Sequence, residues 1–138
     1  MQQVTLTLPM IPNMELTAST TAGALGEHIG MAQDKVEEVQ MAVVEACINA
    51  FEHSRSKVRE VQVQLLVLGA DEDPEGLEIT VADDGIGFDP ADVAERKDGT
   101  ELAKLKRGHG LKIIRSLMDE VTIRSSATGT RVTMRKLR

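Results

Sequence analysis

The 138-residue chain carries 22 acidic and 16 basic side chains, a formal charge of −6, and 41% of its residues are hydrophobic. This content is typical of a globular protein with a hydrophobic core, and the length predicts one domain over residues 1–138. With no Trp or Tyr, two Phe and a net negative charge, the chain lacks the aromatic faces and positive surface of a general nucleic-acid binder.

Cysteine content and hydropathy indicate where the protein acts. The single cysteine, Cys47, cannot form an internal disulfide, and no metal-type cysteine spacing exists. The chain opens without a charged leader, and no apolar run reaches the length of about 18 residues that would suggest a membrane span. We therefore expect a soluble cytoplasmic protein with no membrane and no direct nucleic-acid partner.

Hydrophobic periodicity predicts one strand and two helices in the first part of the chain. Alternating apolar residues indicate a strand over 4–8, and a helix is expected over about 16–31, although its glycines weaken the pattern. A second helix is predicted from the N-cap Asp34, with Glu37 as its capping-box partner, to about His53.

The rest of the chain is predicted to form two hairpins with a helix between them. Residues 61–81 read as two strands joined by a solvated turn over the acidic stretch 69–76. Thr100 is a candidate cap for a short helix, a longer helix is expected over about 110–118, and residues 121–134 form the last hairpin. This order predicts an α+β two-layer sandwich with helices packed on one face of a mixed β-sheet.

The second predicted helix holds a polar pair inside an apolar segment. Glu45 and Asn49 lie four residues apart in VVEACINAF, so they project from one face of a buried helix. Burial of a carboxylate and an amide is costly unless a polar group meets them. A cation such as Mg²⁺ accepts one or two protein oxygens and keeps substrate oxygens, and it would meet them. An ordinary polar stripe at a helix edge is the alternative.

Two glycine-bearing segments are candidates for ligand binding. DDGIGFD at 83–89 follows a strand directly, so its glycines would let the backbone approach a ligand closely, and a carboxylate could accept a hydrogen bond from an exocyclic amine. RGHGL at 107–111 precedes an amphipathic helix, where free backbone amides would bind phosphate. A plain Asp-Gly turn and a flexible linker are the respective alternatives.

Other polar residues have simpler interpretations. Cys47 and His53 lie six apart on one helix, and Cys47 has apolar neighbours, so a core cysteine is favoured over a nucleophile. The chain ends with the basic residues Arg131, Arg135, Lys136 and Arg138. Their alternation with apolar residues predicts the solvated face of a strand.

In combination and in this order, the three candidate segments resemble the nucleotide-binding boxes of the GHKL (Bergerat-fold) ATPase superfamily. The resemblance is closest to its small anti-sigma factor serine/threonine protein kinases. EACINA at 45–50, followed by His53, is similar to the asparagine box, and DGIGFD at 84–89 is similar to the first glycine box. GHGL at 108–111 is similar to the second glycine box, and Thr130 to a threonine that lies beside the adenine.

The resemblance implies roles at the catalytic and adenine ends of a nucleotide site. Glu45 would be the general base that takes a proton from the attacking hydroxyl, and Asn49 would be a ligand of the Mg²⁺ that bridges the ATP phosphates. Asp84 would accept a hydrogen bond from the adenine amine, with Thr130 supporting it through water. Gly87 would allow close approach to the base.

The resemblance also implies a phosphate-binding part and a lid. Residues about 91–106 would form the ATP lid, and His53 belongs to the nucleotide-binding set. The predicted phosphate contacts are Arg107, Gly108, His109, Gly110 and Leu111.

By the same resemblance, the protein would be an ATP-dependent anti-sigma factor. It would bind a sigma factor or similar regulator, phosphorylate a Ser or Thr of its anti-anti-sigma (STAS-type) antagonist, and form a homodimer through its first helix and strand. The alternative is an ATP-binding module that sequesters a regulator without kinase activity. Both need Asn49 and Asp84, whereas the kinase alone needs Glu45 as a base. The third hypothesis is a plain interaction domain that binds no nucleotide. It would leave the Glu45 and Asn49 pair unexplained.

Overall fold

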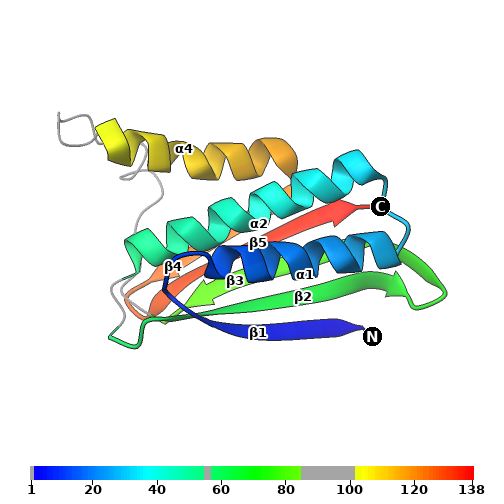
Figure 1. Cartoon of the computed structure of the whole chain (residues 1–138), viewed down its shortest axis with the longest axis horizontal. Coiled ribbons are helices and arrows are strands. Elements are labelled where there is room, and N and C mark those ends of the chain that lie inside the picture. The colour runs from blue at the N-terminus through cyan, green and yellow to red at the C-terminus, as the bar shows by residue number, and fades with distance from the viewer. Residues whose placement is uncertain (1, 55–56, 85–101) are drawn as a thin grey trace.

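The computed structural model describes residues 2–54, 57–84 and 102–138, and for residues 102–109 it describes the backbone alone. Within these ranges, three helices cover one face of a five-stranded sheet (Figure 1). The helices are α1 (Met14–His28), α2 (Gln33–His53) and α4 (Leu102–Leu117). The strands are β1 (Gln3–Pro9), β2 (Glu60–Ala70), β3 (Asp73–Asp83), β4 (Glu120–Ser126) and β5 (Gly129–Leu137). The expected two-layer α+β sandwich is confirmed.

The sheet differs from the expected mixed sheet because every described strand pair is antiparallel. The strand order is β1-β2-β3-β5-β4, and each neighbouring pair runs in opposite directions. Tight hairpins force their strands to be antiparallel, and this applies to β2 with β3 and to β4 with β5. The segment containing α4 carries the chain to the far edge, so β5 returns beside β3 in the opposite direction.

The core lies between the helix layer and the sheet. α2 is the central helix, since it packs between α1 and α4 and over β2, β3 and β5. Alternate side chains of β2 point into this core, and the others lie on the open face of the sheet. The largest fully buried side chains include Leu65, Leu77, Ile79, Ile114 and Met134.

Small side chains allow α1 to pack closely against α2. The residues of α1 that are buried are Ala18, Ala22, Gly23 and Gly26. A Cβ added to Gly23 would lie 2.3 Å from the Gln40 side-chain nitrogen, which donates a hydrogen bond to the Ser19 carbonyl. The glycines that weakened the helix pattern therefore serve close packing, and the helix ends before Gly30, whose φ is +76°.

The N-terminus of α2 differs from the prediction. The N-cap is Ala32, which makes no side-chain capping bond, and its carbonyl accepts the first helical hydrogen bond, from Val36 N. The assignment of Asp34 as N-cap was therefore wrong, because Asp34 lies in the first turn, where a carboxylate favours the positive end of the helix dipole. Glu37 accepts a hydrogen bond from Gln33 rather than acting in a capping box.

The β2–β3 hairpin is longer than the sequence indicated. The acidic segment expected as a turn is mostly strand, since β2 continues to Ala70 and β3 begins at Asp73. The pairing register shifts between Leu68 and Gly69, and Gly69 has a φ of +86°. Such a bulge lets a glycine absorb the extra residue, so the strands keep pairing through a polar stretch.

α2 is the longest helix of the described residues, with 21 residues. It is nonetheless amphipathic, with acidic side chains such as Glu37 on its exposed face. No helix in the described ranges combines the length and the apolar character needed to cross a membrane.

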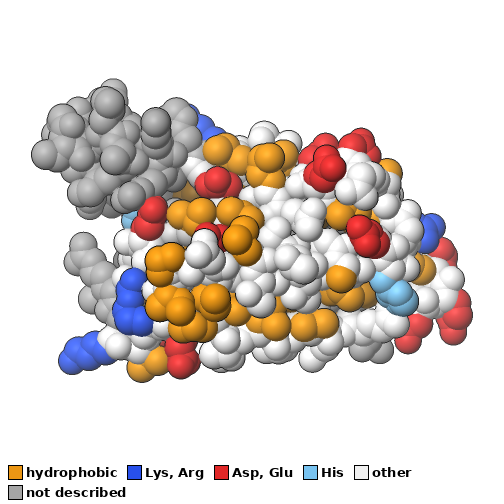
Figure 2. All heavy atoms as spheres, viewed as in Figure 1, with side chains coloured by type: hydrophobic (Ala, Val, Ile, Leu, Met, Phe, Trp, Pro, Cys, Tyr) orange, Lys and Arg blue, Asp and Glu red, His pale blue; other side chains and the backbone are white. Residues whose placement is uncertain are grey.

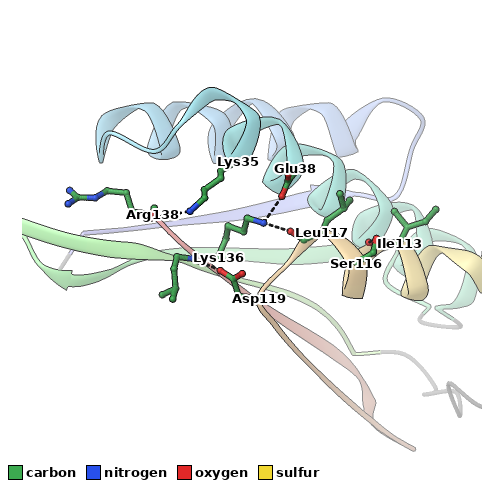
Figure 3. Close-up of polar contacts among 9 residues, drawn as sticks. Lys35, Glu38, Ile113, Ser116, Leu117, Asp119, Lys136 and Arg138 are labelled. Carbon is green, nitrogen blue, oxygen red and sulfur yellow. Dashed lines mark hydrogen bonds and ion pairs between the residues drawn. The ribbon is translucent and has the colours of Figure 1, made fainter.

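The C-terminal end of the chain is tied to both neighbouring helices. Lys136 was expected on a solvated face, but its residue is 7% exposed. Its Nζ donates hydrogen bonds to Glu38 Oε2 of α2 and to the Leu117 carbonyl of α4, each at 2.5 Å (Figure 3). The backbone N–H of Leu137 donates to Asp119 Oδ2 at 2.7 Å. The expectation for Lys136 was wrong, because its side chain lies on the same side of β5 as the buried Val132 and Met134 and therefore points toward the helices.

Candidate functional site

The polar pair of α2 faces α4. Glu45 lies opposite Gly110, because a Cβ added to Gly110 would be 3.2 Å from Glu45 Oε2. Asn49 lies one helical turn further along α2, and both Gly110 and Leu111 are buried. The structure therefore brings Glu45, the first residue of the predicted asparagine box, next to Gly110 of the predicted second glycine box.

The side-chain oxygen of Asn49 is buried and can accept a further bond. Its residue is 4% exposed, and within the described part of the chain its Oδ1 has no hydrogen-bond partner. A buried amide oxygen without a partner costs about 1–3 kcal/mol. A cation that takes one protein oxygen and fills its other positions with substrate oxygens and water fits this atom.

The second cluster lies where β3 ends and β5 begins. The register pairs Asp83 with Thr130, and a Cβ on Gly129 would lie 2.2 Å from the Asp83 carbonyl and 3.0 Å from Asp84 Cα. Thr130 is buried and its Oγ1 lies 3.1 Å from Ser125 Oγ, within hydrogen-bond distance. Asp84 is exposed just beyond the strand. The two predicted adenine residues, Asp84 and Thr130, are thus near neighbours in the fold.

Both clusters lie at one end of the molecule. Figure 1 shows the C-terminal half of α2, the end of β3 and the beginning of β5 at the same end of the sandwich. α2 packs directly on β3 and β5. His53 is the last residue of α2, one turn beyond Asn49, so it also belongs to this end.

Close packing at Gly129 leads to a testable prediction about the stability of the fold. Gly129→Ala is expected to lower the free energy of unfolding by about 1–3 kcal/mol, because φ is +147° and the added Cβ would meet backbone atoms. Gly30→Ala is the control, since its φ is also positive, +76°, but nothing lies within 4 Å of the added Cβ. Denaturant unfolding followed by circular dichroism measures both variants. Equal losses in the two variants would show that the close approach at Gly129 contributes nothing.

The second glycine segment lies within a helix rather than before one. α4 begins at Leu102, so the expectation of separate helices, with free amides at the start of the second, is wrong. A glycine inside a helix costs only about 1 kcal/mol relative to alanine, so one helix continues through both Gly108 and Gly110. Of Arg107, Gly108 and His109 the structure describes only the backbone in α4.

Part of the prediction lies outside the described residues. Gly87, with the rest of the first glycine box after Asp84, falls there, as do Thr100 and most of the predicted lid. The last five residues predicted for the lid, 102–106, form the start of α4.

The structure also shows the surroundings of Ser125 and Cys47. Ser125, the partner of Thr130, was not anticipated, although counting outward from the turn at Gly129 pairs these positions. Burial, together with a smaller effect of the nearby Glu15 carboxylate, raises the pKa of the Cys47 thiol to about 12. The thiol is therefore protonated at neutral pH, in agreement with a core role.

The sequence and the fold match a known domain family. The sequence pattern of the histidine kinase-like ATPase domain matches residues 13–136, and the chain belongs to this family. The chain is 30% identical over 138 residues to the serine-protein kinase RsbW of Bacillus velezensis, covering 96% of this chain and 84% of that protein. It is 32% identical over 109 residues to the serine-protein kinase RsbW of Bacillus cereus strain Q1. That match covers 75% of this chain and spans 65% of the length of the Bacillus cereus protein.

Solved structures show the same fold. The RsbU and RsbW domains of a Mycobacterium tuberculosis protein match with a TM-score of 0.70 and 19% identity, over 99% of this chain and 33% of that one. The histidine kinase domain of a blue-light activated histidine kinase from Erythrobacter litoralis matches with a TM-score of 0.52 and 20% identity. That second match covers 93% of this chain and 64% of the other.

Proposed function

We propose that the protein is an ATP-dependent serine/threonine protein kinase that acts as an anti-sigma factor. The observation that carries this proposal is the proximity of the Glu45 carboxylate to Gly110, one turn from Asn49 Oδ1, which has no hydrogen-bond partner among the described residues. This proximity supports the proposal because a carboxylate that could act as a base, one turn from an amide oxygen that could bind a cation, lies beside a helix position without a side chain. The names of the RsbW relatives, which are serine-protein kinases, support the same reaction class.

In the proposed reaction, Glu45 acts on the hydroxyl of the acceptor side chain. Its carboxylate accepts the hydroxyl proton as the oxygen attacks the γ-phosphorus of ATP, and ADP leaves with the electrons of the broken P–O bond. Phosphoryl transfer needs mainly positioning and charge neutralisation, so a short list of protein groups suffices. The missing Cβ at Gly110 leaves room beside Glu45 that a larger residue would fill.

The cofactor proposed is Mg²⁺, with Asn49 Oδ1 as its protein ligand. When bound, the ion neutralises charge on the ATP phosphates. The proposed phosphate contacts are Arg107, Gly108, His109, Gly110 and Leu111. His53, at the end of α2, is proposed to complete this set.

The adenine end is proposed to lie at the end of β3. Asp84 would accept a hydrogen bond from the adenine amine, and Thr130, held by Ser125 at 3.1 Å, would support it through water. Gly87 is proposed to allow close approach of the base. The pairing of Asp83 with Thr130 supports the assignment, because it holds the two segments side by side.

The proposed partners are a sigma factor or similar regulator and an anti-anti-sigma (STAS-type) antagonist as phosphoacceptor. We also propose a homodimer formed through α1 and β1. Exposed apolar side chains support a protein contact there, since Ile11 and Leu16 are each 52% exposed. Figure 2 shows hydrophobic side chains gathered over the first turns of α1.

Calorimetric titration with Mg·ATP tests the nucleotide site. Asp84→Asn is expected to weaken binding by about 10- to 150-fold, which corresponds to a lost hydrogen bond to a charged group. Asp73→Asn, at the opposite end of β3, is the matched control and is expected to bind like the wild type. Heat is the suitable signal because the chain has no Trp or Tyr. Absence of saturable binding in the wild-type protein would contradict the proposal.

A further inference from the structure

Two arginines on the open face of the sheet lie directly opposite each other. Arg131 of β5 pairs with Arg124 of β4 on one side and with Ala82 of β3 on the other. Both guanidinium groups are exposed, and neither forms an ion pair or side-chain hydrogen bond with any described residue. Like charges facing each other across strands destabilise a sheet, so the pairing needs a reason.

Four residues further along β5, an arginine has the usual neighbours of opposite charge on the adjacent strands. Arg135 lies on the same face of β5 and has a carboxylate on each side, with Nε 2.8 Å from Glu78 Oε1 and Nη1 3.9 Å from Glu120 Oε2. The hydrogen bond and charge of Glu78 raise the pKa of Arg135 above its ordinary value. Arg135 is therefore flanked by a carboxylate on each neighbouring strand, whereas Arg131 is flanked by a second arginine on one strand and by an alanine on the other.

A pocket of about 260 Å³ lies against this arginine pair. Arg124 and Arg131 line it together with Ser126 and Thr128 of the β4–β5 turn. Ser126 Oγ lies 2.9 Å from Thr128 Oγ1 and accepts the Thr128 backbone N–H at 3.2 Å, so the turn holds both hydroxyls in place. Asp83 also borders the pocket, but strand alternation directs its side chain toward the helix layer.

We propose that Arg124 and Arg131 form a binding site for a phosphate monoester group on the open face of the sheet. Two guanidinium groups without an ion-pair partner among the described residues match a dianion in charge, and each offers planar N–H donors that fit phosphate oxygens in pairs. The hydroxyls of Ser126 and Thr128 add donors at the rim. Thr130 also borders the pocket, but strand alternation directs its side chain toward the helices, so the proposal does not depend on the nucleotide site.

The test is a titration of the uniformly ¹⁵N-labelled protein followed by NMR. The probes are inorganic phosphate and O-phosphoserine, with chloride at matched ionic strength and serine as controls. Saturable shifts are expected in the amide signals of residues 124–131, and not in those of Gly110 and Leu111. The double variant Arg124→Gln/Arg131→Gln is expected to bind at least tenfold more weakly, whereas Arg135→Gln stays within twofold of wild type.

Two further readouts separate the site from general surface charge. Arg131→Gln is expected to raise the thermal unfolding midpoint, because it removes like-charge repulsion, and Arg135→Gln is expected to lower it. The double variant is expected to bind Mg·ATP with unchanged affinity. O-phosphoserine binding tenfold tighter than inorganic phosphate would identify a phosphorylated side chain as the source, and equal affinity a small phosphate. Shifts that fail to saturate, or that weaken equally in Arg135→Gln, would overturn the proposal.

Discussion

Glu45→Gln is expected to slow phosphoryl transfer by about 10²- to 10⁴-fold while leaving the affinity for Mg·ATP nearly unchanged. The amide keeps the shape and the contact beside Gly110, but it cannot accept the proton of the acceptor hydroxyl. Asn49 and the residues at the end of β3, which are proposed to hold the nucleotide, are left intact. Transfer of labelled phosphate from ATP to a partner protein, measured beside calorimetric binding, gives the two quantities separately.

The matched control is Glu37→Gln, the same chemical change on an exposed turn of α2. Among the described residues its carboxylate accepts a hydrogen bond only from Gln33, at 3.4 Å, so transfer and binding are both expected to match wild type. Persistence of transfer in Glu45→Gln would refute the assigned base. Binding of Mg·ATP without transfer in the wild-type protein would instead favour the sequestering module, in which Glu45 has no chemical role.

The sequence predicted the elements of this fold where local patterns and tertiary packing agree. Alternating apolar residues in β2 and β3 reflect burial on one face, and the apolar stripe of α2 reflects its central position between α1 and α4. The predictions were wrong where tertiary packing overrides a local sequence preference. Asp34 has good capping chemistry, but the packing that buries Met31 and Val36 begins the helix two residues earlier.

The candidate site was predictable to the extent that its residues share one element. Glu45 and Asn49 emerge from a single helix, so spacing alone put them on one face. The neighbourhood of Asp84 and Thr130 depends on β5 returning beside β3, which local patterns do not determine. Local patterns also do not reveal that Glu45 faces Gly110, because that approach joins two helices far apart in the chain, and the family resemblance alone suggested that both residues belong to one site.

Lys136→Met is expected to lower the free energy of unfolding by about 2–4 kcal/mol. Methionine fills a similar volume, but it leaves the Leu117 carbonyl and the Glu38 carboxylate without the ammonium group that joins them (Figure 3). Removal of one partner from a fully buried ion pair costs about 3–5 kcal/mol. The range here is set lower because the side chain of Glu38 is 39% exposed and water can solvate it. Chemical unfolding followed by circular dichroism measures the loss.

Lys35→Met on α2 is the matched control, since the only hydrogen bond of its Nζ within the described part of the chain is to the exposed Arg138 carbonyl, at 3.3 Å. Its effect is expected to stay within about 0.5 kcal/mol of zero. A double-mutant cycle with Glu38→Gln then isolates the pair, and the double variant is expected to lose less than the sum of the single losses. Additive losses within about 0.5 kcal/mol would contradict the direct coupling. The coupling matters for the site because Lys136 fixes the end of the helix whose middle presents Gly110 to Glu45. Loosening that helix is therefore expected to weaken Mg·ATP binding in Lys136→Met, although Lys136 lies outside the proposed nucleotide site.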